Sequence, residues 1–117
     1  MNQIPAQLLP KALEKKILLS KLGKILVEHD RKSAMYIPTL IFIKTYIPPI
    51  KFYNEHLKFE RKIAQVKFPQ VTIFDLELKE LEKFESGMLT AEDILKKILD
   101  ANKNLGGEAN NDIIAWD

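Results

Sequence analysis

The chain has 117 residues, of which 46% are hydrophobic and 29% charged, and it contains no cysteine. This length and composition predict one globular domain with its own core, and they exclude a disulfide scaffold. The lack of cysteine also excludes thiol redox chemistry, cysteine nucleophiles and thiolate metal sites. No stretch approaches the roughly 20 apolar residues that a membrane-spanning helix needs.

The net charge of +2 conceals a strong asymmetry along the chain. Residues 1–67 include 13 basic and 5 acidic residues, whereas residues 68–117 include 5 basic and 11 acidic ones. Such a chain can lay a basic face on a polyanion while its acidic half meets protein or solvent. An unevenly charged, solvated surface explains the same pattern, so composition alone leaves both explanations open.

The N-terminal part predicts a helix followed by a strand. Apolar residues four positions apart predict the helix over residues 10–22, which Gly23 would end. Strict alternation over residues 24–30 then predicts a strand. One side of that strand consists of Ile25, Val27 and His29.

The middle of the chain is divided by its prolines. Pro38 suits the first turn of a short helix. The residue before a proline is pushed out of helical geometry, so the step at residues 47–49 predicts that this helix ends near Tyr46. A short strand is then predicted over residues 50–53, with Ile50 and Phe52 facing the core and Lys51 and Tyr53 facing away.

The second half predicts two further strands and a helix. Alternation over residues 58–66 and β-branched residues over 71–78 indicate the strands, and the charged stretch 79–87 indicates a loop or a frayed strand extension. Thr90 is the expected N-cap of the last helix. The core-facing stripe of that helix consists of Ala91, Ile94, Leu95 and Ile98.

This order of elements predicts an α/β domain. A strand–helix–strand unit implies a parallel pair, and closely following strands imply an antiparallel hairpin. A four-stranded mixed sheet with flanking helices and no redox motif is the minimal thioredoxin-like arrangement. We expect a basic N-terminal extension over residues 1–23, this domain over 24–103, and a polar tail over 104–117. The tail ends in an apolar cluster expected to dock on a partner: Ile113, Ile114 and Trp116.

One motif resembles a known family. It reads Ile47-Pro48-Pro49-Ile50-Lys51-Phe52-Tyr53-Asn54. It is similar to the Leu-Pro-x-Leu-Lys-aromatic-x-Asn-Pro stretch of a domain shared by mitochondrial ribosomal proteins of both subunits and a small accessory subunit of respiratory Complex I. The similarity extends loosely over residues 24–102 and is greatest to a fungal large-subunit member. This chain has Pro38-Thr39-Leu40 where the family has Gly-Ala-Arg, and Glu55 where it has proline.

The resemblance implies a thioredoxin-like fold, ribosomal RNA and other mitochondrial ribosomal proteins as partners, and the mitochondrial matrix as location. Residues 1–24 carry five lysines and one acid, the charge balance of a targeting segment, which we expect to be retained. An accessory subunit of Complex I, acting through protein contacts without RNA, is the alternative. The concentrated positive charge of the first third favours the ribosomal interpretation, because a protein interface does not need it.

Phosphate contacts would come from basic side chains, sixteen lysines against two arginines, which favours charge neutralisation over base recognition. The RNA-binding candidates are Lys11, Lys15, Lys16, Lys21, Lys24, Arg31, Lys32, Lys51, Lys58, Arg61 and Lys62. Two histidines without ligand spacing, and serines outside any nucleophile motif, indicate no active site. We therefore expect no enzyme, metal, cofactor or small-molecule substrate.

Overall fold

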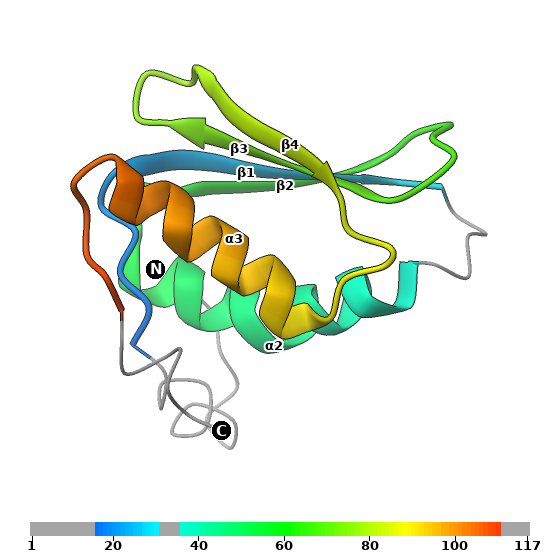
Figure 1. Ribbon diagram of the computed structural model, residues 1–117, viewed down its shortest axis with the longest axis horizontal. Coiled ribbons are helices and arrows are strands. Elements are labelled where there is room, and N and C mark those ends of the chain that lie inside the picture. Colours follow the sequence, from blue (N-terminus) through cyan, green and yellow to red (C-terminus); the bar gives the residue numbers. More distant parts are fainter. Residues whose placement is uncertain (1–15, 31–35, 111–117) are drawn as a thin grey trace.

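The computed structural model describes residues 16–30 and 36–110, and these form a thioredoxin-like α/β domain (Figure 1). Its elements are β1 (Leu22–His29), α2 (Ile37–Tyr53), β2 (Lys58–Ile63), β3 (Gln70–Asp75), β4 (Glu80–Glu85) and α3 (Ala91–Asn104). The four strands form one mixed sheet in the order β2-β1-β3-β4. Strands β1 and β2 are parallel, and the other two pairs are antiparallel. The predicted fold class is confirmed.

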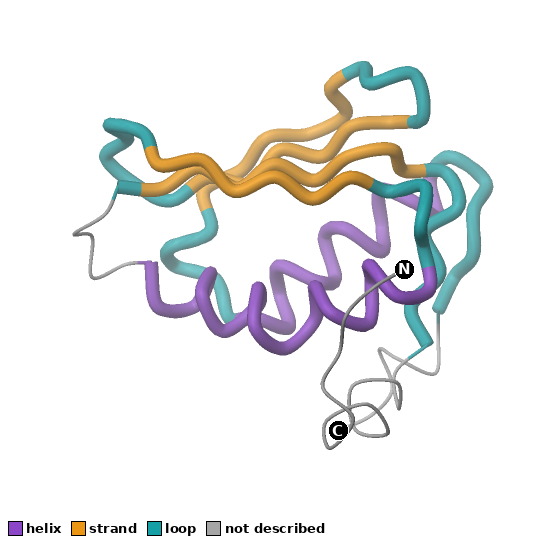
Figure 2. The backbone as a smooth tube through the Cα atoms, turned by 180° about the vertical axis from the view of Figure 1, so that it is seen from behind, coloured by secondary structure: helices purple, strands orange, loops and turns teal. Residues whose placement is uncertain are grey.

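Both helices lie on the same face of the sheet, and no helix of the described residues covers the opposite face (Figures 1 and 2). The core fills the space between the sheet and the two helices. Its fully buried side chains include Ile25, Val27, Val71 and Ile73 from the sheet, and Phe42, Ile50, Ile94 and Ile98 from the helices. Ion pairs cross the uncovered face, with Lys24 Nζ at 2.7 Å from Glu60 and Lys83 Nζ at 4.0 Å from Glu28.

Strand β1 confirms the predicted alternation, because Ile25, Val27 and His29 are buried and the residues between them are half-buried. The predicted helix over residues 10–22 is wrong where the structure can test it, since residues 16–21 are not helical and Leu22 already belongs to β1. Its first part lies outside the described residues. Ile17 and Leu19 are buried in an irregular segment and Leu22 is buried at the start of β1, so tertiary contacts outweigh the weak helical spacing.

Gly23 lies within β1 and does not end a helix. A Cβ at this position would stand 2.4 Å from the carbonyl oxygen of Asp75 on the neighbouring strand. Strands β1 and β3 approach each other this closely beside a register shift between Leu22 and Lys24. Glycine is therefore required by the strand pairing.

Helix α2 continues seven residues beyond its predicted end and passes through Pro48 and Pro49. The predicted strand over residues 50–53 is therefore wrong. Proline removes the backbone donor to the carbonyl four residues earlier, here that of Lys44 or Thr45. Both residues are exposed, so water can replace the lost bonds, while the buried stripe continues through Phe42, Tyr46 and Ile50.

The fourth strand of the sheet is β4, in the charged stretch whose sequence predicts a loop or a frayed strand extension. It pairs antiparallel with β3 after a turn in which the Asp75 carboxylate accepts hydrogen bonds from the backbone N–H of Glu77 and Lys79, both at 2.9 Å. Strand β3 accordingly ends at Asp75 rather than at residue 78. Because β4 is an edge strand with only Phe84 packed against the core, it lacks the apolar alternation by which strands are recognised.

Helix α3 begins as predicted. The Thr90 hydroxyl accepts a hydrogen bond from the backbone N–H of Asp93 at 3.1 Å, and the Asp93 carboxylate accepts one from the Thr90 N–H at 3.3 Å. This reciprocal capping box stabilises the first turn. The predicted core stripe is buried, and the helix continues to Asn104.

Candidate functional site

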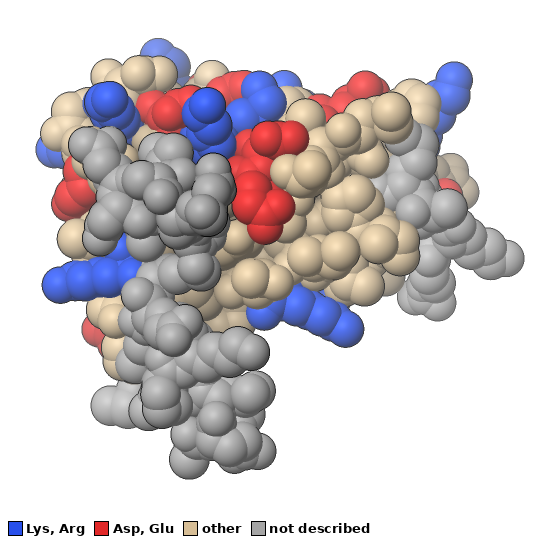
Figure 3. Space-filling view, turned by 60° about the horizontal axis from the view of Figure 1, so that its bottom comes forward, with Lys and Arg blue, Asp and Glu red and all other residues tan. Residues whose placement is uncertain are grey.

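The structure brings several RNA-binding candidates to one end of the molecule. Lys11, Lys15, Arg31 and Lys32 lie outside the described residues. Among the others, the end where α2 finishes and where β1 and β2 begin carries a group that we call the basic end: Lys16, Lys21, Lys24, Lys51 and Lys58. Figure 3 shows Lys and Arg side chains interspersed with acidic ones in its left half, and further basic side chains at the lower middle and the upper right. Sequence positions 42 residues apart thus meet on one surface.

Chain topology explains this gathering. Because β1 and β2 are parallel, their first residues stand side by side, and Lys24 is the register partner of Lys58. Helix α2 runs back along the sheet, so its last turn with Lys51 returns to the same end. Lys16 joins the group, since its Nζ lies 5.9 Å from the ring centroid of Tyr53.

Two buried asparagines hold the segment that carries Lys16 and Lys21. Asn54, the C-cap of α2, accepts a hydrogen bond from the Leu19 N–H and donates to the carbonyl oxygens of Ile17 and Ile50, all at 2.8 Å. Asn102 in the last turn of α3 accepts from the Lys21 N–H at 3.0 Å. Both side chains are almost fully buried, and their bonds replace strand pairing for this extended segment.

A third contact comes from the segment after α3. The Glu108 carboxylate accepts hydrogen bonds from the backbone N–H and the hydroxyl of Ser20, at 3.2 and 2.9 Å, and from the Asn102 amide at 3.2 Å. Burial alone would raise the pKa of Glu108, but these bonds and one from its own backbone N–H outweigh it and lower the pKa to about 2. Residues 105–110 therefore pack against the segment before β1.

Four of the five lysines of the basic end have no ion-pair partner among the described residues. Lys24 is engaged with Glu60, whose pKa is lowered by the hydrogen bond and the positive charge of that lysine. Within residues 16–30 and 36–110, no carboxylate stands within ion-pair distance of the remaining four, and all four are exposed. Those four lysines are Lys16, Lys21, Lys51 and Lys58.

Arg61 and Lys62 do not belong to the basic end. The Arg61 guanidinium donates from Nε to His29 Nε2 at 3.0 Å and lies 5.2 Å from the ring centroid of Tyr36. The His29 and Tyr36 rings stack at 3.9 Å, so this cluster packs together at the opposite ends of β1 and β2. Because His29 Nε2 accepts a hydrogen bond, its ring proton is on Nδ1, which donates to the Asp30 carbonyl. Lys62 is exposed near the same end of β2.

The family-like motif forms the last two turns of α2 and its C-cap. Ile47, Ile50 and Asn54 are buried, and Lys51 is exposed. Pro49 is also buried, whereas Pro48, Phe52 and Tyr53 are half-buried, and the rings of Phe52 and Tyr53 meet edge to face at 5.2 Å. The sequence contains no signal for the Asn54 hydrogen bonds to Leu19 and Ile17, because these partners lie 35 and 37 residues away in the chain. Asn54 is also not in the left-handed conformation for which asparagine is favoured after a helix.

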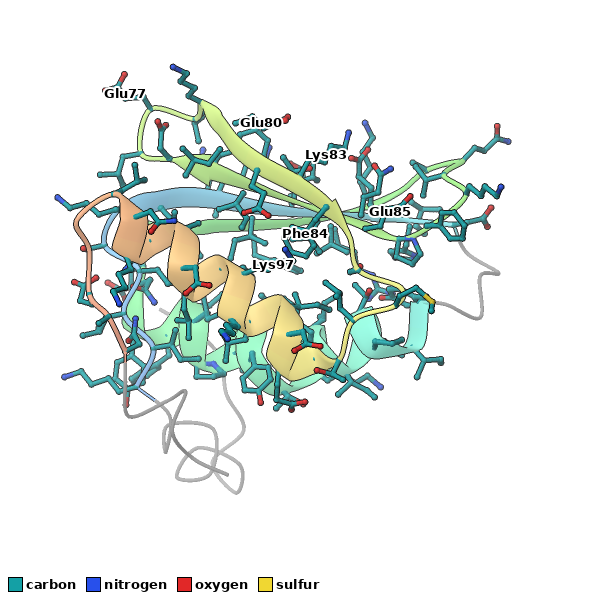
Figure 4. All side chains as sticks on the ribbon, in the orientation of Figure 1. Glu77, Glu80, Lys83, Phe84, Glu85 and Lys97 are labelled. Atoms are coloured by element: carbon teal, nitrogen blue, oxygen red, sulfur yellow. The ribbon has the colours of Figure 1, made fainter. Side chains whose placement is uncertain are left out.

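Several acidic residues of the second half of the chain lie together along one edge of the sheet. Strand β4, at the edge opposite β2, carries three acidic residues and one lysine, and Figure 4 shows its charged side chains projecting from the β3–β4 hairpin. Glu82 forms an ion pair with Lys97 at 3.5 Å, and Lys97 lies 5.2 Å from the Phe84 ring centroid. The sheet therefore runs from a basic edge to an acidic edge.

The described residues contain no recognisable catalytic constellation. No three histidine, aspartate or glutamate side chains among them lie close enough together to hold a metal ion. Ser86 Oγ shares a buried hydrogen bond of 2.6 Å with Thr39 Oγ1, and exposed His56 contacts the carbonyl oxygens of Leu19 and Leu22. Across residues 16–30 and 36–110, no helix is both long and apolar enough to cross a membrane. The apolar cluster at Ile113, Ile114 and Trp116 lies outside the described residues.

Comparison of the chain with models of known protein families, and with curated proteins, found no match. Assignment of function therefore depends on the surfaces described above and on the motif at the end of α2.

Proposed function

We propose that this protein is a non-catalytic structural component of the mitochondrial ribosome in the matrix, in the large subunit. Its basic end contacts ribosomal RNA, and its acidic second half contacts neighbouring ribosomal proteins. The observation that carries this proposal is the basic end itself, where four exposed lysines without an ion-pair partner in the described chain come together from three separate segments. The motif-level resemblance of residues 47–54 supplies the ribosomal context.

The chemistry of the basic end suits phosphate rather than base recognition. Lysine carries a compact point charge on a flexible stem and lacks the planar fork that reads guanine. Contacts of this kind position a protein on folded RNA without reading its sequence. A ribosomal structural protein needs that property, because its place is also determined by its protein neighbours.

A pure protein-interaction module, such as an accessory subunit of respiratory Complex I, is the second candidate. Two features favour a protein-interaction module: the acidic edge formed by β4, and the ion pairs between strands on the uncovered face of the sheet. Both suit contact with protein neighbours. The two functions differ in one requirement. Only the ribosomal function needs the basic end.

The discriminating experiment is sedimentation of the tagged full chain in a gradient of mitochondrial lysate. The chain is expected to migrate with the large ribosomal subunit, and a variant with Lys16, Lys21, Lys51 and Lys58 replaced by alanine should move to the top of the gradient. The control removes the same charge from exposed positions elsewhere: Lys44, Lys67, Lys83 and Lys96. Migration with Complex I would contradict the ribosomal function.

Binding to ribosomal RNA fragments in titrated salt measures the contact directly. The logarithm of affinity should fall linearly with the logarithm of salt concentration, with a slope of about 0.7–0.9 for each lysine that neutralises a phosphate. The basic-end variant should reduce that slope, and the control variant should leave it unchanged. Equal slopes for both variants would show that the basic end is only a solvated surface.

A further inference from the structure

An apolar hollow opens at the end of the molecule opposite the basic end. It has a volume of about 470 Å³ and lies between the first turns of α2 and the loop that joins β4 to α3. We call it the apolar hollow, and its lining residues are Pro38, Ile41, Gly87, Met88, Leu89, Thr90, Ala91 and Glu92. In the right half of Figure 3, uncharged side chains form a continuous surface between a group of acidic side chains and a basic side chain at its lower edge.

Two apolar side chains of the lining and one beside it are exposed. Met88 is 85% exposed, and Ile41 of the lining is 50% exposed. Ile37, one turn earlier on α2, is 55% exposed. Single exposed apolar residues are common on protein surfaces, whereas these lie together at one concave site.

Hydrogen bonds position the loop that forms one wall of the hollow. Ser86, just before the loop, is fully buried, and its hydroxyl shares a 2.6 Å hydrogen bond with Thr39 of α2. The Ser86 N–H donates to the Pro69 carbonyl at 2.9 Å, and the Leu89 N–H donates to the Ser86 carbonyl at 3.2 Å. The capping box at Thr90 secures the other side of the loop. A preformed site reduces the entropy cost of binding.

The lining of the hollow carries one negative charge. Glu92 is its single charged lining residue, and the Glu92 carboxylate accepts a hydrogen bond from the Tyr46 hydroxyl at 3.0 Å. Burial, together with this hydrogen bond to the carboxylate, raises the pKa of Tyr46 far above its ordinary value, so Tyr46 stays a neutral donor that orients Glu92. A carboxylate at an apolar rim attracts a cation and repels the phosphates of RNA.

We propose that the apolar hollow binds a protein partner through one large apolar side chain with a lysine or arginine beside it in the partner's chain. The apolar side chain fills the space between Ile41 and Met88, and the basic group meets Glu92. This surface is separate from the basic end, so one molecule can bind RNA and a protein neighbour together. The inference does not depend on the ribosomal assignment, because it needs only a protein partner.

The test uses a display library of random twelve-residue peptides selected on the purified full chain, with affinities then measured by fluorescence anisotropy. Selected peptides should share a large apolar residue within two positions of a lysine or arginine. Their affinity should fall at least tenfold for Met88→Glu and for Ile41→Glu, because each substitution places a charge in the apolar contact. Glu92→Gln keeps an acceptor for Tyr46 and should weaken the same peptides about two- to fivefold, the usual effect of one exposed ion pair.

Controls matched to Ile41→Glu place the same charge on apolar residues of similar exposure elsewhere in the domain. Leu76 in the β3–β4 turn is 55% exposed and Ile63 in β2 is 53% exposed, so Leu76→Glu and Ile63→Glu should leave peptide affinity unchanged. Circular dichroism and thermal unfolding of all variants establish that they fold. This comparison separates loss of the contact from loss of the structure.

Three results would overturn the proposal. The first is selection of peptides that bind Met88→Glu as tightly as the unaltered chain. The second is self-association in sedimentation equilibrium that Met88→Glu abolishes, which would make a second copy the occupant. The third is peptide binding that appears only after residues 111–117 are removed, which would make this chain's own apolar cluster the occupant.

Discussion

The two ends of the molecule differ in charge and in the hydrogen bonds that hold them. At the basic end, both helices finish with a lysine in the last turn, where it complements the negative end of the helix dipole. At the other end, both helices begin around the apolar hollow. Asn54 and Asn102 shape the basic end through hydrogen bonds to backbone 35 and 81 residues away. The hollow combines one buried long-range hydrogen bond, between Ser86 and Thr39, with an exposed capping box whose two partners are three positions apart.

This difference has a physical consequence for how each surface can be altered. Buried, long-range hydrogen bonds make the position of the basic end part of the global fold, because their loss leaves polar backbone groups unsatisfied. The capping box is exposed and local, so its loss frays one helix turn. Substitutions at the two ends should therefore differ in how much they lower the free energy of unfolding.

The largest loss of stability is expected from truncating a buried side chain of α2, the helix that connects the two ends. Ile50 is fully buried in the helix, while Phe52 two positions later is only half-buried. Ile50→Ala should therefore lower the free energy of unfolding by about 2–5 kcal/mol. Phe52→Ala should cost roughly 1–2 kcal/mol, in the range of ordinary substitutions. Chemical denaturation measures both, and equal losses would instead indicate the strand geometry in which both residues face the core.

A smaller difference is expected between the two kinds of anchor. Asn54→Ala leaves the Leu19 N–H and the Ile17 carbonyl without their buried partners and should cost about 2–3 kcal/mol. Thr90→Ala removes the local cap and should cost about 1 kcal/mol. Asn104→Ala, at an exposed position, serves as the control in urea denaturation. An Asn54 variant as stable as this control would show that the segment before β1 is not held by the asparagine.

The smallest effect is a pH dependence at the basic end. The folded state holds the pKa of Glu108 at about 2, below its ordinary value of 4.5. The charged carboxylate therefore stabilises the folded state fully above pH 4.5, and this contribution disappears as the pH falls toward 2. Glu108→Gln should flatten the thermal stability profile in that interval. If the loss of thermal stability at acidic pH is the same in Glu108→Gln as in the unaltered chain, Glu108 does not contribute to the packing of residues 105–110.

Local signals account for the parts of the fold that the sequence predicted correctly. The alternation of β1 and the apolar stripe of α3 are periodic patterns that only one structure satisfies, and Thr90 followed by Asp93 is a complete capping signal within four residues. The α/β class and the mixed sheet also follow from the order of elements. These features depend on neighbours in the chain, so a single sequence contains them.

Tertiary structure alone decided the rest, because the deciding partners are distant in the sequence. Pro48 and Pro49 remain helical since α2 buries one stripe against the sheet while the carbonyls that lose donors belong to exposed residues. Strand β4 forms because it pairs with β3 through backbone hydrogen bonds. Its own charged sequence does not predict a strand. The basic end and the apolar hollow arise in the same way, since parallel pairing and helix reversal bring together residues that no local spacing connects.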